Sequence, residues 1–185
     1  MQPTVLIVPG LRDHVDAHWQ TLLAAQLPAV RTVPAMGRSG AGLDRAARVQ
    51  AIEREAQAID GPIVIVAHSG GCSMLAHWAA QTRRPVKGAL LATPPELDQP
   101  MPEGYPPLQA LKDGGWFPVP MQALPFPSIV AASRNDPLAR FAKVEQMARI
   151  WGSRLVDLGE VGHLNPASGF GPWPRALDFI AELSA

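Results

Sequence analysis

The stretch "PIVIVAHSGGCSML" (residues 62–75) decides the fold expected of this chain. Its first six residues are almost all apolar, which indicates a strand that is covered on both faces of a sheet. From Gly71 onward, apolar residues recur three and four positions apart, which indicates a helix. Only His68, Ser69 and Gly70 stand between the two segments. A buried strand that turns this sharply into a helix is typical of sheets built from βαβ units.

The same alternation of short apolar runs and longer segments of helical period extends along the whole chain. It predicts an α/β fold, in one domain over residues 1–185, with a doubly wound and mostly parallel sheet of six strands. The strands are expected at residues 4–8, 30–34, 62–67, 86–92, 128–133 and 154–158. The helices are expected at residues 16–27, 43–59, 71–82, 138–152 and 173–183, with a short one near 107–112.

Composition limits the classes of partner. The chain has sixteen Lys plus Arg and sixteen Asp plus Glu among 185 residues, and the basic residues form no stripe, so neither nucleic acid nor an anionic membrane surface is expected. No apolar run approaches the roughly 18 residues of a membrane span. The balanced charge favours a small neutral or apolar ligand. With no signal peptide and the single Cys72, the sequence predicts a cytoplasmic protein. A protein partner is neither indicated nor excluded.

One segment departs from the alternating pattern. Residues 93–127 contain ten of the twenty prolines, so little regular structure is expected there. A loop of that length inside a compact domain usually has a function, and covering a binding site is the common one. Trp116 and Phe117 are therefore candidates for the wall of an acyl pocket. The alternative is that these two aromatic side chains only seal the core.

Ser69 is the candidate nucleophile, although its motif alone is weak. The nucleophile-elbow pattern G-x-S-x-G is matched only in part, because Ala67 occupies the place of the first glycine. Residues 37–41 match equally well around Ser39, but a nucleophile elbow needs a buried strand before the serine and a helix after it. Only Ser69 has that context. Its alternative interpretation is an ordinary helix N-cap, which would not require the two glycines that follow.

A serine hydroxyl needs a base to accept its proton and an acid to orient that base. The chain order expected for a nucleophile elbow is Ser, then Asp or Glu, then His. Asp136 follows the strand predicted at 128–133, and His163 follows the strand predicted at 154–158. Because parallel strands end at a common sheet edge, the sequence predicts that Ser69, Asp136 and His163 meet there. Taken singly, Asp136 could begin a turn and His163 could be a surface histidine.

The remaining histidines compete less well for the role of base. His68 adjoins the nucleophile and must point elsewhere, His77 lies far along the following helix, and His14 and His18 lie near the first turn. His18 is a candidate for a supporting role beneath the site. No two histidines have metal-ligand spacing within one element, and residues 37–42 lack the ending of a phosphate loop, so neither metal nor cofactor is expected.

The oxyanion of an acyl-transfer reaction needs backbone N–H donors. In this arrangement one donor follows the nucleophile, and the other lies in the turn after an early strand. Gly70 and Leu11 occupy those positions. Gly10 allows the early turn to bend over the site, and Gly71 allows the helix to pack close to the sheet.

These residues carry a family resemblance. The segments "VPGL", "HWQ", "AHSGG", "LPFP", "SRNDP", "GHLN" and "SGFGPWP" resemble those of the small serine hydrolases of the α/β-hydrolase superfamily that include retinoblastoma-binding protein nine. The resemblance runs nearly end to end. It implies a compact hydrolase core without a cap domain and the sheet order 2-1-3-4-5-6. It also implies Ser69 as nucleophile, Asp136 as orienting acid and His163 as base, and it leaves the substrate open.

The sequence therefore predicts a carboxylesterase-like serine hydrolase that forms an acyl-enzyme on Ser69. Its turnover is expected to rise with pH through roughly 6 to 7, since the base must be a neutral histidine. Two alternatives remain, a non-catalytic binding protein on a hydrolase fold and an acyltransferase. Labelling of Ser69 by a fluorophosphonate probe separates the first alternative from an enzyme, and product analysis separates the second from a hydrolase.

Overall fold

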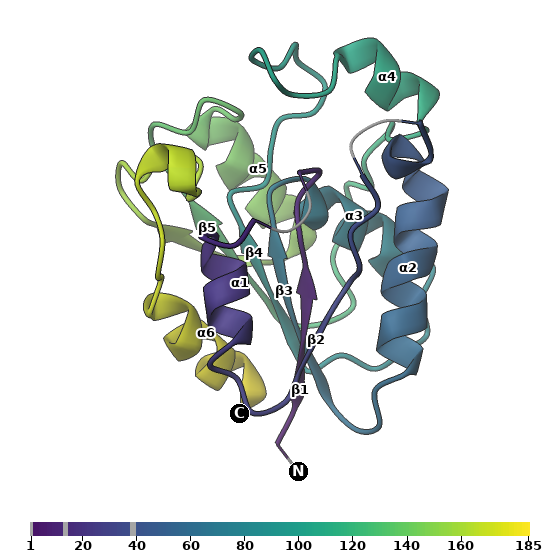
Figure 1. The fold of residues 1–185 in the computed structure, drawn as a ribbon, viewed down its shortest axis with the longest axis vertical. Coiled ribbons are helices and arrows are strands. Elements are labelled where there is room, and N and C mark those ends of the chain that lie inside the picture. The colour runs from purple at the N-terminus through teal and green to yellow at the C-terminus, as the bar shows by residue number, and fades with distance from the viewer. Residues whose placement is uncertain (1, 13–14, 38–39) are drawn as a thin grey trace.

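A single sheet of parallel strands forms the centre of the computed structural model (Figure 1), which describes residues 2–12, 15–37 and 40–185. Within these ranges the sheet has six strands in the order β2-β1-β3-β4-β5-β6, as the sequence predicts. Every neighbouring pair is parallel, so the sheet is wholly rather than mostly parallel. The strands are β1 (Thr4–Val8), β2 (Val30–Thr32), β3 (Ile63–His68), β4 (Gly88–Ala92), β5 (Ser128–Ala132) and β6 (Arg154–Asp157).

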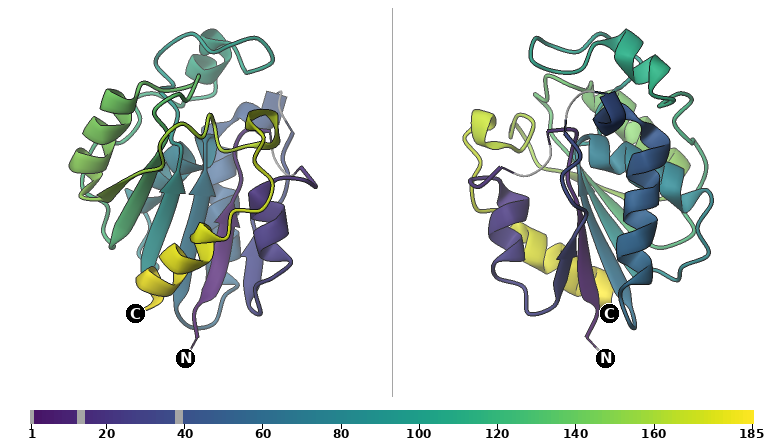
Figure 2. Two further views of the ribbon diagram at one scale, coloured as in Figure 1. Left: turned by 90° about the vertical axis from the view of Figure 1, so that its left-hand side faces the viewer. Right: turned by 45° about the vertical axis from the view of Figure 1, so that its right-hand side comes forward.

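Helices cover both faces of the sheet. Two helices pack on one face, three on the other, and one lies in the proline-rich segment beyond the carboxyl ends of the strands (Figure 2). The first pair is α1 (Trp19–Ala24) and α6 (Arg175–Ser184), and the opposite face carries α2 (Arg45–Gln57), α3 (Gly70–Ala79) and α5 (Phe141–Trp151). The proline-rich segment holds α4 (Leu108–Asp113), and two short 3-10 helices are η1 (Gly40–Leu43) and η2 (Pro166–Ser168).

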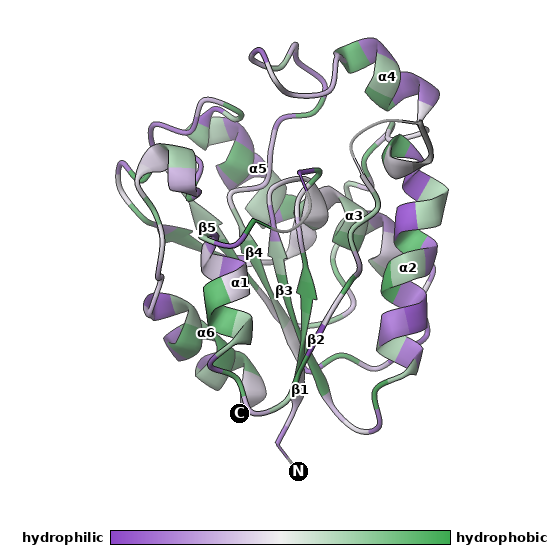
Figure 3. Cartoon of the chain, viewed as in Figure 1, coloured by the Kyte–Doolittle hydropathy of each residue, from purple (hydrophilic) through white to green (hydrophobic). Residues whose placement is uncertain are grey.

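The alternation of side chains along β3 divides the core into two layers. Ile63 and Ile65 pack beneath α2, α3 and α5, whereas Val64 and Val66 pack beneath α1 and α6. This follows from the period of two in a strand, and it explains why a strand covered on both faces is apolar throughout. Figure 3 shows the hydrophobic colour along the central strands and a hydrophilic outer side on α2. Each fully buried large apolar side chain contributes roughly 1.5–3 kcal/mol to folding.

Two helices begin three residues later than the sequence predicts. The helix expected from residue 16 begins at Trp19, because His18 is extended and its Nδ1 accepts the backbone N–H of Gln20 at 3.2 Å. The helix expected from residue 138 begins at Phe141, because the Asp136 carboxylate accepts the backbone N–H of Leu138 at 2.9 Å and forms a turn there. The former helix also ends early, at Ala24, and the other predicted elements agree with the structure to within three residues at each end.

The strand order reverses at β1. The chain passes from β1 to one edge of the sheet at β2 and then returns to β3 on the other side of β1. Ligands in open α/β sheets bind at the carboxyl ends of the strands where the order reverses in this way.

In the part of the chain that the structure describes, no helix has both the length and the hydropathy needed to cross a bilayer.

Candidate active site

Ser69 lies in a strained turn between β3 and α3. Its backbone has φ 55° and ψ −131°, a region that costs a residue with a side chain about 1–3 kcal/mol. The Ser69 side chain makes no capping hydrogen bond to α3, so the interpretation of this residue as an ordinary N-cap is wrong. The turn is held from the neighbouring strand, because the backbone N–H of Ser69 donates to the carbonyl of Ala92 at 2.9 Å. The result is a hydroxyl that points away from the helix it precedes.

Glycines next to this turn allow the backbones to approach closely. A Cβ on Gly71 would stand 2.5 Å from the carbonyl oxygen of Val8, and a Cβ on Gly10 would stand 3.1 Å from the Cβ of Ser69. Real Cβ atoms do not approach a backbone oxygen as closely as the first of these distances. Gly71 therefore lets α3 lie against the end of β1, as expected from the sequence.

The structure brings the three side chains of the predicted triad together. The hydroxyl of Ser69 lies 2.7 Å from Nε2 of His163, and Nδ1 of His163 lies 2.9 Å from both carboxylate oxygens of Asp136. Nδ1–H therefore donates to the carboxylate, and Nε2 is left to accept the serine proton. The side chains of His163 and Asp136 are 3% and 2% exposed, so water competes little for these hydrogen bonds.

The loop that carries His163 is joined to the loop that carries Asp136. The side-chain oxygen of Asn135 accepts the backbone N–H of Gly162 at 2.7 Å and the hydroxyl of Ser133 at 3.0 Å. The backbone N–H of His163 donates to the hydroxyl of Ser168 at 2.9 Å. These bonds fix the position of the imidazole from its own backbone and not only through the carboxylate.

The proline-rich segment is tied to the same acid-bearing loop. Glu96 is buried and forms an ion pair with Arg140, and its backbone N–H donates to the carbonyl of Leu138 at 2.9 Å. The hydrogen bond from Arg140 holds the pKa of the Glu96 carboxyl below its ordinary value. The segment that covers the site is thus anchored beside Asp136.

Leu11 and Gly70, the predicted oxyanion donors, lie side by side next to Ser69. A Cβ built on Gly70 would stand 3.5 Å from the backbone nitrogen of Leu11, which places the two backbones in direct contact. Within the described ranges, neither backbone N–H donates to another backbone carbonyl. Both residues line the cavity that contains Ser69, so both N–H groups are available to a ligand there.

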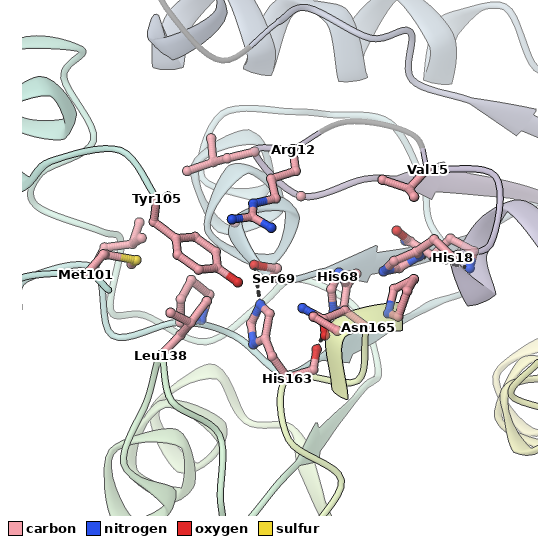
Figure 4. Close-up of a pocket in the computed structure, with 18 residues that line it drawn as sticks. Arg12, Val15, His18, His68, Ser69, Met101, Tyr105, Leu138, His163 and Asn165 are labelled. Atoms are coloured by element: carbon pink, nitrogen blue, oxygen red, sulfur yellow. Dashed lines mark hydrogen bonds between the residues drawn. The ribbon is translucent and has the colours of Figure 1, made fainter. Parts of the chain in front are cut away.

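This cavity is the candidate substrate pocket (Figure 4). The space within it, counted together with its open mouth, is about 790 Å³. Ser69, His163 and His68 form its floor, and apolar side chains make up most of its wall. The lining side chains outside the floor include Leu11, Arg12, Val15, His18, Gln20, Pro95, Leu97, Met101, Tyr105, Leu138 and Asn165.

The expectation that Trp116 and Phe117 form the pocket wall needs correction. Trp116 is fully buried, and its indole N–H donates to the carbonyl of Leu43 at 2.7 Å, away from the pocket. Phe117 packs against the same core cluster. Neither lines the cavity, so the alternative interpretation, in which both seal the core, describes their place. The proline-rich segment contributes Pro95, Leu97, Met101 and Tyr105 to the wall instead.

Comparison with known proteins agrees with the serine, histidine and aspartate geometry of the site. A family model described as serine hydrolase matches residues 5–182. The chain belongs to this serine hydrolase family. A YdeN-like hydrolase of Pectobacterium atrosepticum is 34% identical to the chain, and the match covers 99% of this chain and 91% of that one with a TM-score of 0.81. The α/β-hydrolase fold predicted from the sequence is thereby confirmed.

More distant structures share the fold. The ydeN gene product of B. subtilis is 18% identical to this serine hydrolase, with a TM-score of 0.75 and 98% of each chain covered. Est1E of Butyrivibrio proteoclasticus, solved with ferulic acid bound, is 15% identical, with a TM-score of 0.71 and with 98% of this chain and 89% of that chain covered. At such identities the likeness concerns the fold alone. Comparison with curated proteins gives no match.

His68 is a site residue of the hydrolase to which the sequence assigned no role. His68 is buried, and its Nε2–H donates to the backbone carbonyl of His163 at 2.9 Å. Burial lowers the pKa of His68 well below its ordinary value, and the imidazoles of His163 and His18 lower it further. A signal was present in the sequence, because His68 continues the alternation of Val64 and Val66 and must face the same layer as they do.

The other candidates of the sequence take different places. The ring of His18 is tilted against that of His68, with 4.6 Å between the ring centres, and His18 lines the pocket of the hydrolase beside it, where a supporting role was predicted. His77 donates from Nε2 to the carbonyl of Trp116 at 3.1 Å and does not line the pocket. Ser39 and His14 lie outside the described residues.

Proposed function

We propose that this serine hydrolase cleaves small carboxylic esters through an acyl-enzyme on Ser69. One observation carries the proposal, namely the continuous chain of hydrogen bonds from Ser69 through His163 to Asp136 at the floor of an apolar pocket. A buried carboxylate next to one imidazole nitrogen and a serine hydroxyl next to the other are the parts that acyl transfer needs.

Acylation begins with attack of Ser69 Oγ on the carbonyl carbon of the ester. The serine proton moves to Nε2 of His163, and Asp136 accepts the Nδ1–H and stabilises the imidazolium that forms. The carbonyl oxygen becomes an oxyanion, and the N–H groups of Leu11 and Gly70 donate to it; their proximity to one another and to the cavity supports this role. One such donor is worth about a hundred- to a thousand-fold in rate.

Breakdown of the tetrahedral intermediate releases the alcohol. The bond between the carbonyl carbon and the alcohol oxygen breaks, and that oxygen takes the proton from His163 Nε2. A water molecule then gives its proton to the same nitrogen and attacks the acyl-serine carbon. The bond from that carbon to Ser69 Oγ breaks, Oγ regains the proton, and the carboxylic acid leaves.

Two measurements test the proposal together. Hydrolysis of p-nitrophenyl butyrate and labelling by a fluorophosphonate probe are both expected of the wild-type protein. In Ser69→Ala and in His163→Ala, kcat is expected to fall by at least about 10⁴-fold, and labelling should disappear. Ser184→Ala is the matched control, since this serine lies in α6 with its hydroxyl bonded to the carbonyl of Ile180.

Three results would contradict the proposal. Undiminished turnover in Ser69→Ala would place the reaction elsewhere. Absence of both labelling and turnover in the folded wild-type protein would favour a non-catalytic binding protein on this fold. Predominant formation of a new ester when an alcohol acceptor is added would favour an acyltransferase.

A further inference from the structure

The substrate pocket contains one permanently charged side chain. Among the residues described as lining it, Arg12 is the only Lys, Arg, Asp or Glu. The Asp136 carboxylate lies behind His163 and is 2% exposed. The remaining wall is largely apolar, with Val15, Leu97 and Leu138 among its side chains.

Arg12 is held over the mouth of the pocket. It directly follows Leu11, and its guanidinium carbon lies 4.3 Å from the centre of the Tyr105 ring. One of its N–H groups donates to the carbonyl of Gly104 at 3.1 Å. The Tyr105 ring lies in turn edge-on to the His163 ring, at 6.5 Å between centres. Figure 4 shows the guanidinium of Arg12 and the ring of Tyr105 close together beside Ser69.

The contacts of Arg12 leave much of its hydrogen-bonding capacity unused. A guanidinium carries five N–H donors in a planar fork, and Gly104 accepts from one of them. In the described part of the chain, Arg12 forms no ion pair with a carboxylate. Among the described residues, the Arg12 side chain is therefore positioned by Gly104 and Tyr105 but is not neutralised by a carboxylate.

Asn165 adds a second donor on the opposite side of His163. The Oδ1 of Asn165 accepts both the backbone N–H and the hydroxyl of Ser168, at 3.0 and 2.9 Å. Because the backbone N–H of Ser168 can only donate, the Asn165 atom that it meets must be the carbonyl oxygen, and the Ser168 hydroxyl donates to the same oxygen. This fixes the orientation of the Asn165 amide and turns its NH₂ group away from η2, and Asn165 lines the pocket.

We infer that the physiological ester carries a carboxylate and that Arg12 binds it. The inference rests on the proposed ester hydrolysis at Ser69 and names its substrate class. A guanidinium binds a carboxylate through two parallel N–H···O bonds and stays charged when water is excluded. One cation matches one carboxylate, whereas a phosphate dianion would leave a charge unmatched. The apolar wall then contacts the spacer between the carboxylate and the ester.

Two pairs of esters of equal shape test the inference. Monoethyl adipate and the ethyl ester of adipamic acid differ only in a carboxylate on the acyl side. Para-acetoxybenzoate and para-acetoxybenzamide differ only in a carboxylate on the leaving-group side. In at least one pair, kcat/KM is expected to be about 10- to 100-fold higher for the carboxylate, as expected for charge-assisted hydrogen bonds. The ratio should shrink as salt is added.

Variants of Arg12 assign this preference to one side chain. Arg12→Gln is expected to bring the carboxylate-to-amide ratio to about one, and Arg12→Lys to an intermediate value, because lysine keeps the charge without the planar fork. Arg54→Gln should keep the wild-type ratio, since Arg54 is an exposed arginine in the last turn of α2. In Ser69→Ala, which binds without cleaving, the thermal shift produced by the preferred carboxylate ester should exceed that of its amide partner and be lost when Arg12→Gln is added.

The outcomes separate this inference from the proposed function. If the wild type hydrolyses both members of both pairs equally and Ser69 is labelled, the carboxylate inference is overturned and the esterase proposal stands. If Arg12→Gln lowers kcat/KM equally for both members of a pair, Arg12 only holds Tyr105 in position, and the inference is again overturned. If no ester is cleaved and Ser69 is not labelled, it is the proposed function that fails.

Discussion

The floor and the rim of the pocket are held in different ways. The floor, formed by Ser69, His163 and His68 with Asp136 behind His163, is fixed to strand ends by buried hydrogen bonds between loops. The rim comprises Arg12, Val15, Met101 and Tyr105. Its side chains are exposed or half-buried. Among the described residues its two sides are joined by the hydrogen bond from the Arg12 guanidinium to the carbonyl of Gly104 and by the contact of that guanidinium with the Tyr105 ring. The chemistry is thus built into the fold, while the selection of substrate rests on parts that can change without unfolding it.

The largest expected effect comes from the charge beneath the floor. Asp136→Asn keeps the shape but removes the carboxylate that fixes the tautomer of His163, so kcat is expected to fall by about 10³–10⁴-fold. Asp113→Asn, in α4, should leave kcat within about twofold, because its carboxylate bonds only to Gln109 on the same helix. Steady-state hydrolysis of p-nitrophenyl butyrate measures both. A loss below tenfold in Asp136→Asn would mean that the floor does not depend on this charge.

Gly71→Ala disturbs the backbone that holds the floor. The new Cβ would meet the carbonyl oxygens of Val8 and Pro9 at 2.5 and 2.8 Å, so α3 must move. We expect the free energy of unfolding to fall by about 1–3 kcal/mol, and kcat to fall by about 100-fold because the nucleophile is displaced. Gly171→Ala is the matched control, since a Cβ there meets no atom closer than 4.0 Å. Urea denaturation and ester turnover are the measurements, and equal effects of the two substitutions would refute close packing as the reason for Gly71.

His68 makes the free energy of unfolding depend on pH. Its pKa in the folded protein lies well below the ordinary value of 6.5, mainly because it is buried, so below pH 6.5 the unfolded chain binds a proton that the folded chain excludes. The free energy of unfolding should therefore fall as the pH drops from about 7 to 5, by up to about 1.4 kcal/mol per pH unit.

His68→Gln should flatten this dependence, whatever it does to stability at pH 7. His77→Gln is expected to flatten it less, because His77 is only partly buried and its pKa is lowered less strongly. The lowered carboxyl pKa values of Glu53 and Glu96 concern a more acidic range, below their ordinary value of 4.5. Urea denaturation at three pH values gives the slopes, and identical slopes for wild type and His68→Gln would show that His68 is not excluded from protonation in the fold.

The smallest expected effect lies at the rim. Tyr105→Leu removes the ring under Arg12, a cation–π contact worth about 0.5–1 kcal/mol at an exposed site. We expect kcat/KM to change by about fivefold or less, and the free energy of unfolding by about 0.5 kcal/mol or less. A destabilisation as large as that of Gly71→Ala would mean that the rim belongs to the folded core after all.

The parts of the fold and site that could be predicted share a local signal. An apolar run before Ser69 and a helical period after it predict the elbow, because the turn lies between two elements whose patterns are local. Asp136 and His163 could be placed since each follows a strand, and parallel strands end at one edge of the sheet. The sheet order came from the family resemblance, and the structure confirms it.

The parts that could not be predicted depend on contacts between distant loops. Trp116 and Tyr105 stand in one proline-rich segment, and no local pattern says which of them faces the pocket. The choice follows from the indole N–H of Trp116, which finds a buried acceptor in the carbonyl of Leu43. In the same way, the hydrogen bond from Asn135 to the backbone of Gly162 joins two turns whose separation in space is set by the finished sheet.

The left-handed backbone of Ser69 has a consequence for the way such a chain can evolve. Ser69 carries a side chain in a conformation that glycine adopts more easily. The turn is therefore less stable with serine than it would be with glycine. If selection for turnover were relaxed, mutations that relieve the turn would be favoured by stability alone. A descendant protein that keeps serine in this turn keeps it despite the backbone strain. Its retention therefore indicates that selection for turnover continues.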